Sequence, residues 1–115
     1  MLAYKVVQPG SRASCVAEGI YKKIYSPGSV VTAQEGTLGI FCFETSLEAW
    51  EWVQSGLNRW MVIEVNGLGH PTTPTKILVH EFIWATDIRD YSSCLVKTYI
   101  PKGTICFESV EVPNV

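Results

Sequence analysis

The sequence has no excess of basic residues and no run of charges of one sign. Nine lysines and arginines stand against eleven aspartates and glutamates, which leaves a formal net charge of −2 at pH 7. Proteins that bind nucleic acid by neutralising its phosphates carry a basic excess or a basic patch. We therefore expect no nucleic-acid partner.

Long apolar runs are also absent, although 47% of the residues are hydrophobic. A membrane-spanning helix needs roughly 18 or more consecutive apolar residues, and no stretch of this chain approaches that length. The segment from Met1 to Gln8 lacks the pattern of a secretory signal, because Lys5 interrupts a short apolar run. From these patterns we expect no membrane partner and a cytoplasmic location.

The common catalytic and metal-binding motifs are missing as well. The four cysteines form no Cys-x-x-Cys pair. Gly67-Leu68-Gly69 lacks the third glycine of a phosphate-binding loop, and His80-Glu81 is followed by Trp84 where a zincin has its second histidine. No Gly-x-Ser-x-Gly elbow is present either. We therefore expect no cofactor and no metal ion.

What the chain does contain is a regular alternation of turn residues with β-branched and aromatic runs, which is typical of antiparallel sheets. The predicted extended segments are Tyr4–Gln8, Ile20–Tyr25, Val30–Ala33, Leu38–Phe43, Arg59–Val65, Lys76–Ala85, Ser93–Ile100 and Thr104–Val112. The longest, Lys76–Ala85, is apolar on both faces, which favours a central strand. A loop of turn-forming residues is predicted at Asn66–Pro74.

One helix is predicted at about residues 46–55. Thr45-Ser46-Leu47-Glu48 is a capping box, and Gly56 can end the helix. At 100° per residue, Ala49, Trp50, Val53 and Leu57 face the sheet, and Trp52 faces solvent. The 115 residues then form a single domain, 1–115. The expected fold class is α+β, with six or seven mostly antiparallel strands in a curved sheet or open barrel and one packed helix.

Two of the cysteines lie in apolar segments. Cys42 stands between Phe41 and Phe43, and Cys106 stands in the segment Thr104–Val112. Both are predicted to be buried, since cysteine in such surroundings packs as a small hydrophobe. Cys15 follows the polar segment 11–14 and is the candidate for a reactive thiol.

Tryptophans supply the first candidate binding residues. Trp52 lies off the predicted core face of its helix, and Trp60 alternates with Val62 and Glu64, away from Met61 and Ile63. An exposed tryptophan often marks an interface or a stacking surface. The alternative for Trp60 is that the loop from Gly67 to Thr75 covers it.

Charged and hydroxyl side chains supply the second set. The loops Ser11–Ser14, Ser26–Ser29 and Gly67–Thr75 offer backbone amides and hydroxyls. Together with Arg12 or Arg59 they can hold a phosphate or another small anion. Glu81 interrupts an apolar strand face, so it lies either at the rim of the sheet or in a pocket. In a pocket, burial would raise the pKa of its carboxyl and make it a site candidate.

The motifs also carry a family resemblance. The segments are Tyr4-Lys5-Val6-Val7, Ser14, Gly36-Thr37-Leu38-Gly39-Ile40-Phe41-Cys42-Phe43, Ala49 and Pro101-Lys102-Gly103-Thr104. Together they resemble small uncharacterised proteins of phage and bacterial genomes, which implies a phage-encoded protein acting in the host cytoplasm. A strand, a glycine-bracketed strand and a capped helix are also distantly similar to the opening half of ADP-ribosyltransferase-like folds. The first strand lacks the arginine or histidine that those enzymes use for the nicotinamide cofactor.

The leading hypothesis is therefore a small non-enzymatic binding protein that acts through an oligomeric or partner interface. We expect a homo-oligomer, or a complex with a host defence protein or a small nucleotide-like ligand that is inhibited or sequestered. One alternative is a small ADP-ribosyltransferase-like or hydrolase-like enzyme, whose pocket would combine Glu81 or His80 with Arg12 or Ser14. Another is a virion or accessory structural protein.

Overall fold

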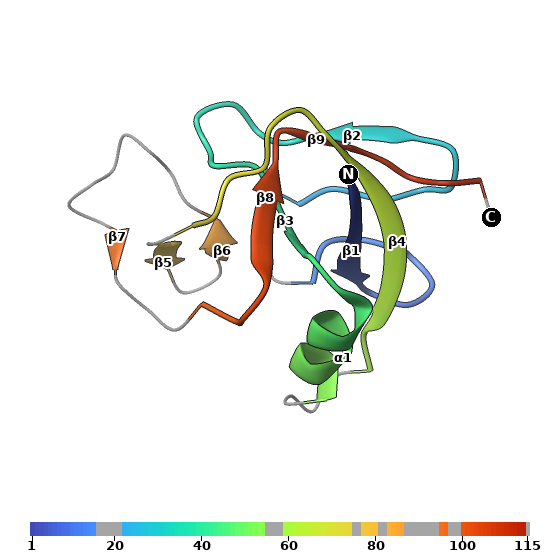
Figure 1. Cartoon of the computed structure of the whole chain (residues 1–115), viewed down its shortest axis with the longest axis horizontal. Helices are drawn as coiled ribbons and strands as arrows, with labels where there is room; N and C mark the ends of the chain where they lie inside the picture. Colours follow the sequence, from blue (N-terminus) through green and yellow to red (C-terminus); the bar gives the residue numbers. More distant parts are fainter. Residues whose placement is uncertain are drawn as a thin grey trace.

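The computed structural model describes residues 1–15, 22–54, 59–74, 77–80, 83–86, 95–96 and 100–114. They form an α+β fold, as predicted, with a six-stranded antiparallel sheet that is not closed into a barrel (Figure 1). The strands follow in the spatial order β2 (Val30–Thr32), β9 (Ser109–Glu111), β4 (Met61–Leu68), β1 (Leu2–Val7), β3 (Ile40–Phe43) and β8 (Thr104–Phe107).

The sheet is strongly curved: β8 is the last strand of the order and β9 is the second, yet only Glu108 separates them in the chain. The edge of β8 is also covered. Thr72, four residues after β4, forms an isolated bridge with Cys106 through backbone hydrogen bonds of 2.9 and 2.8 Å. The predicted strand Thr104–Val112 is thus two strands. The break at Glu108 lets one continuous segment pair with β3 at one edge of the sheet and with β4 and β2 near the other.

The inner face of the curved sheet holds the larger core. Every strand contributes, and alternate residues point inward, as a pleated strand requires. Its buried members are Ala3, Val7, Tyr25, Val31, Ile40, Cys42, Ile63, Val65, Ile105, Phe107, Val110 and Val112. The predicted inward positions Ile63 and Val65 and the predicted burial of Cys42 are confirmed; Met61 is partly buried against the same core. Cys106 is buried too.

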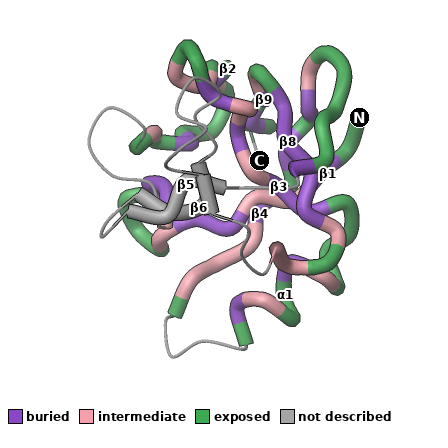
Figure 2. The backbone as a smooth tube through the Cα atoms, turned by 90° about the vertical axis from the view of Figure 1, so that its left-hand side faces the viewer, coloured by how far each residue is buried: buried purple, intermediate pink, exposed green. Residues whose placement is uncertain are grey.

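The helix α1 (Ser46–Gln54) packs on the opposite face, against β1, β3 and β4. Its predicted start is confirmed, because the Glu48 amide donates to the Thr45 hydroxyl at 3.2 Å and that hydroxyl donates to the Glu48 carboxylate at 2.9 Å. Within α1 only Ala49 and Val53 are buried (Figure 2). No helix among the described residues is long and apolar enough to cross a membrane.

Two sequence predictions for residues 66–85 are wrong. The segment Lys76–Ala85 is not one long central strand: β5 (Ile77–His80) and β6 (Ile83–Thr86) pair antiparallel in a second sheet with β7 (Leu95–Val96). The predicted loop does not begin at Asn66 either, since β4 continues to Leu68. An apolar run interrupted by His80-Glu81 can form a strand pair as readily as one strand, and periodicity alone does not separate the two.

The predicted strand Ile20–Tyr25 is described only from residue 22. In that part Ile24 forms an isolated bridge with Ala13 and no strand is present. Most of the predicted strand Ser93–Ile100 lies outside the described residues, as do Leu57 and Cys94.

Candidate binding surface

Trp52 and Trp60 are brought together on the α1 side of the sheet. Their rings stack with centroids 5.1 Å apart and planes 28° apart, and Trp52 also lies 5.8 Å from the ring of Phe43. These rings pack with Val6, Ala49 and Val53 in a second apolar cluster. It is therefore α1, and not the loop after β4, that covers Trp60.

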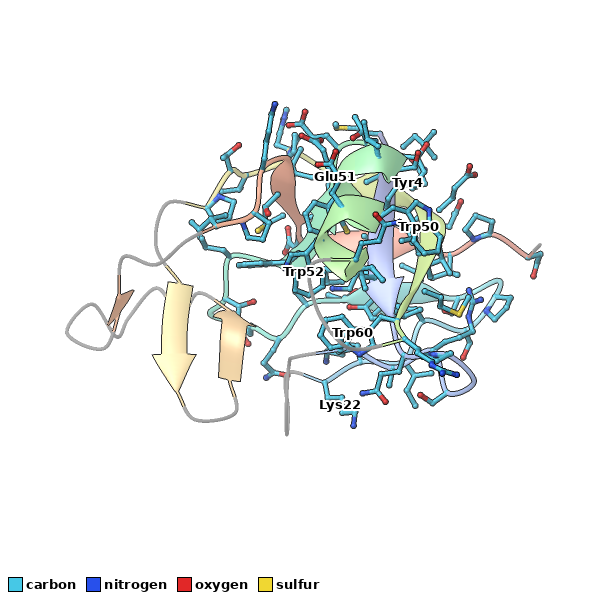
Figure 3. All side chains as sticks on the ribbon, turned by 90° about the horizontal axis from the view of Figure 1, so that it is seen from below. Tyr4, Lys22, Trp50, Glu51, Trp52 and Trp60 are labelled. Carbon is cyan, nitrogen blue, oxygen red and sulfur yellow. The ribbon has the colours of Figure 1, made fainter. Side chains whose placement is uncertain are left out.

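The assignment of the helix faces must be corrected. Trp52 was predicted to face solvent and Trp50 to face the sheet, but Trp52 is partly buried and Trp50 is 44% exposed. Figure 3 shows the two rings on opposite sides of α1. The buried stripe of the helix is centred between Ala49 and Val53, and each tryptophan lies about 80° around the helix from that centre. Helical geometry therefore does not determine which tryptophan is buried. Trp52 is the buried one because its ring contacts Trp60 and Phe43.

Arg12 and Ser14 lie together in the loop after β1, where both side chains bond to backbone. The Arg12 Nε donates to the Tyr25 carbonyl at 2.7 Å, and Arg12 itself has a positive φ of 59°. The Ser14 hydroxyl, which is buried, accepts from the Lys23 amide at 3.0 Å and lies 3.3 Å from its carbonyl. These contacts hold residues 8–15 against 22–25.

The remaining predicted site residues do not join them. Arg59 is exposed just before β4. Glu81 lies outside the described residues, and the His80 side chain lies outside them as well, so the pocket combining them with Arg12 or Ser14 stays a prediction. No group of three or more His, Cys, Asp or Glu side chains within the described parts of the chain is arranged to hold a metal ion.

The thiol of Cys15, the candidate for a reactive cysteine, is partly buried in the second apolar cluster. Burial raises its pKa to about 11, although nearby Lys5 opposes that rise. A thiol with such a pKa is protonated near neutral pH, and the thiolate is the nucleophile. The structure therefore argues against a reactive thiol at this position.

Part of the sheet face that carries α1 is not covered by the helix, and the sequence did not reveal this exposed part. Directly opposite residues of antiparallel strands point to the same face. Leu2 lies opposite Asn66, Asn66 lies opposite Glu111, and Glu111 lies opposite Val30. Tyr4 lies opposite Glu64 and belongs to the cluster under α1, so all of these residues are on the face that carries α1.

We call the exposed residues of this face the open face. They lie on β1, β2, β4 and β9, beyond the part of the sheet that α1 covers. Its members are Leu2, Val30, Thr32, Glu64, Asn66 and Glu111. These residues can be assigned to one face only from the strand register. Strands as short as β2 and β9 show too little alternation of apolar and polar residues to indicate which of their faces is buried.

Exposed apolar side chains gather on this side of the sheet. Among the residues whose burial the structure describes (1–15, 22–54, 59–74 and 100–114), six large hydrophobic side chains are exposed. Leu2 (55%) and Val30 (59%) are on the open face, and Leu47 (66%) and Trp50 (44%) are on the outer surface of α1. Exposed apolar residues grouped on one side mark an interaction surface more often than scattered ones do.

Comparisons with protein-family models, with curated proteins and with solved structures gave no match to this chain.

Proposed function

We propose that the protein is a binding protein that contacts a macromolecular partner through the side of its sheet that carries α1. One observation carries the proposal: among the residues whose burial the structure describes, exposed large hydrophobic side chains lie on this side both on the sheet and on α1. Leu2 and Val30 lie on the open face, and Leu47 and Trp50 lie on α1.

The two tryptophans of α1 have different roles in this proposal. Trp52 stacks on Trp60 and fixes the helix on the sheet. Trp50, on the other side of α1, has its ring available to a partner (Figure 3). Tryptophan is among the residues that contribute most to binding energy when an interface buries it.

Native mass spectrometry of protein freshly purified from producing cells tests the proposal. The wild type is compared with a Val30→Ser/Trp50→Ser double variant and with Glu35→Gln as the control. Glu35 is exposed in the turn that follows β2 and belongs neither to the open face nor to α1.

We expect the wild type and Glu35→Gln to retain a species heavier than one chain, and the double variant to lose it. The same complexes in all three proteins, or a bare single chain for the wild type, would contradict the proposal. A mass that is a multiple of the chain identifies self-association, and any other added mass identifies a different partner.

A further inference from the structure

We propose that the occupant of the open face is a cationic polypeptide segment, with lysine or arginine side chains set among apolar ones. This inference rests on the proposed function and adds the chemistry of the partner. It follows from the charges on the open face and on α1, together with their exposed apolar side chains.

The open face carries two carboxylates and no basic side chain. Glu64 and Glu111 are diagonal neighbours on β4 and β9, because Glu111 lies opposite Asn66, two residues beyond Glu64. Such neighbours are roughly 7–8 Å apart. A single ammonium or guanidinium group above Asn66 can therefore approach both carboxylates.

The basic side chains of the neighbouring elements do not fill this position. Lys5 is the only lysine or arginine in the six strands of the large sheet. It alternates with Tyr4 and Val6 and so points to the inner side, where its Nζ donates to the Phe41 carbonyl at 2.7 Å. α1 contains Glu48 and Glu51 and no basic residue.

One cation lies at the edge of the open face. The Met1 amino group donates to Asn66 Oδ1 at 3.0 Å and to the Gly67 carbonyl at 2.9 Å. Those two bonds direct it to the amide side chain and the backbone of β4. Neither bond involves the carboxylates of Glu64 and Glu111.

Apolar side chains flank the carboxylates. Leu2 lies on one side of Asn66, and Val30 lies beyond Glu111 on the other. A partner that buries these two side chains also brings its own backbone over the carboxylates. The open face therefore requires apolar and cationic groups in the same segment.

The same charges disfavour the other possible occupants. A second copy joined by a two-fold axis would set this face against itself and bring like carboxylates together. Nucleic acid and anionic lipid surfaces present phosphates, which Glu64 and Glu111 repel. A cationic segment is the occupant whose charge complements that of the face.

The test uses two synthetic amphipathic peptides, one of leucine and lysine and the other with glutamate in place of every lysine. Each is titrated into the ¹⁵N-labelled full chain, and the amide signals are followed by NMR. We expect the lysine peptide to bind and to shift the signals of Leu2, Val30 and Asn66, and the glutamate peptide to leave them in place.

Charge-removal variants give the matched comparison. Glu64→Gln/Glu111→Gln keeps the shape of the face and removes its charge. We expect it to weaken binding of the lysine peptide about tenfold, because each of the two exposed ion pairs that are lost contributes about threefold in affinity. Glu35→Gln is the control. Glu35 is exposed in the turn that follows the Thr32 end of β2, away from Val30.

Three results would overturn the inference: equal affinity for both peptides, unchanged affinity in the double variant, or signal shifts that map away from the open face. Self-association without peptide binding would assign the face to a second copy. Binding to phosphatidylserine vesicles in place of the lysine peptide would assign it to a membrane. In these last two cases the inference about a cationic segment fails, whereas the proposed function is tested independently by native mass spectrometry.

Discussion

The ring of Phe107 lies against Gly67, in the space that a side chain at position 67 would fill. Phe107 is on β8, at one edge of the sheet, and Gly67 is on β4, with β3 and β1 between them in the order of strands. The contact therefore crosses the inside of the curved sheet. It explains why Phe107 is fully buried although its strand is at an edge.

Gly67→Ala is expected to destabilise the protein by about 1–3 kcal/mol, the usual cost of overfilling a packed core. In a Phe107→Leu background the same substitution should cost less, because the smaller side chain leaves room for the methyl group. Chemical denaturation of the four proteins of this cycle measures the difference.

Gly69→Ala is the control for that cycle. Gly69 has a φ of +78° and nothing near the position of an added Cβ, so its cost of about 1 kcal/mol is conformational. That cost should be the same with and without Phe107→Leu. Equal costs of Gly67→Ala in both backgrounds would show that the Phe107 ring does not constrain position 67.

Gly67 also shows why part of the fold was beyond sequence reasoning. Asn66-Gly67 has the composition of a turn, and it was predicted as the start of a loop. In the structure Gly67 lies inside β4, and the ring of Phe107, 40 positions later in the chain, occupies the space that a side chain at position 67 would fill. Gly39 was easier, because a glycine within an apolar run already suggests a close backbone approach or a bulge. An added Cβ there would meet the Phe107 carbonyl.

The Trp52–Trp60 stack is expected to contribute to stability. Trp52→Ala should lower the free energy of unfolding by about 2–3 kcal/mol, because it removes a partly buried ring from the contact with Trp60 and Phe43. Trp50→Ala, on the exposed side of α1, should change it by less than about 1 kcal/mol. Urea denaturation compares the two, and a larger loss for Trp50→Ala would reverse the assignment of the helix faces.

The helix itself was predictable and its orientation was not. The capping box is a local pattern, and its hydrogen bonds form within Thr45–Glu48. The predicted core face of α1 included Leu57, which tilted that face toward Trp50, but Leu57 lies outside the described residues. With Ala49 and Val53 alone, the two tryptophans are equivalent, so only tertiary contacts select Trp52.

Thr45→Ala is expected to cost about 1 kcal/mol, the usual effect of losing a helix N-cap. The Thr45 hydroxyl bonds both to the Glu48 amide and to its carboxylate, and neither bond survives the change. Ser46→Ala, at the first residue of α1, is the control and should stay within about 0.5 kcal/mol. Equal effects in thermal unfolding would contradict the capping role.

Alkaline pH is expected to destabilise the fold. Burial raises the pKa of Cys42 to about 11 from its ordinary value of 9.0, and burial also raises the pKa of Tyr25. The unfolded chain therefore loses these protons at lower pH than the folded chain. The stability is fully present below pH 9 and is lost as the pH rises toward 11, by about 1–3 kcal/mol for Cys42.

Urea denaturation at pH 8, 9, 10 and 10.5 measures this loss. Cys42→Ala should show a smaller decrease across the series than the wild type, because one of the shifted groups has been removed. A decrease of the same size in the variant would show that the Cys42 thiol is not the source.

The most direct test of the account is site-specific photo-cross-linking in producing cells, with a photoreactive amino acid at position 30, at position 50 or at the control position 35. If a partner binds the side of the sheet that carries α1, positions 30 and 50 should form discrete adducts with one polypeptide, and position 35 should not. Adducts of the same kind at all three positions, or at position 35 alone, would contradict a partner on this side.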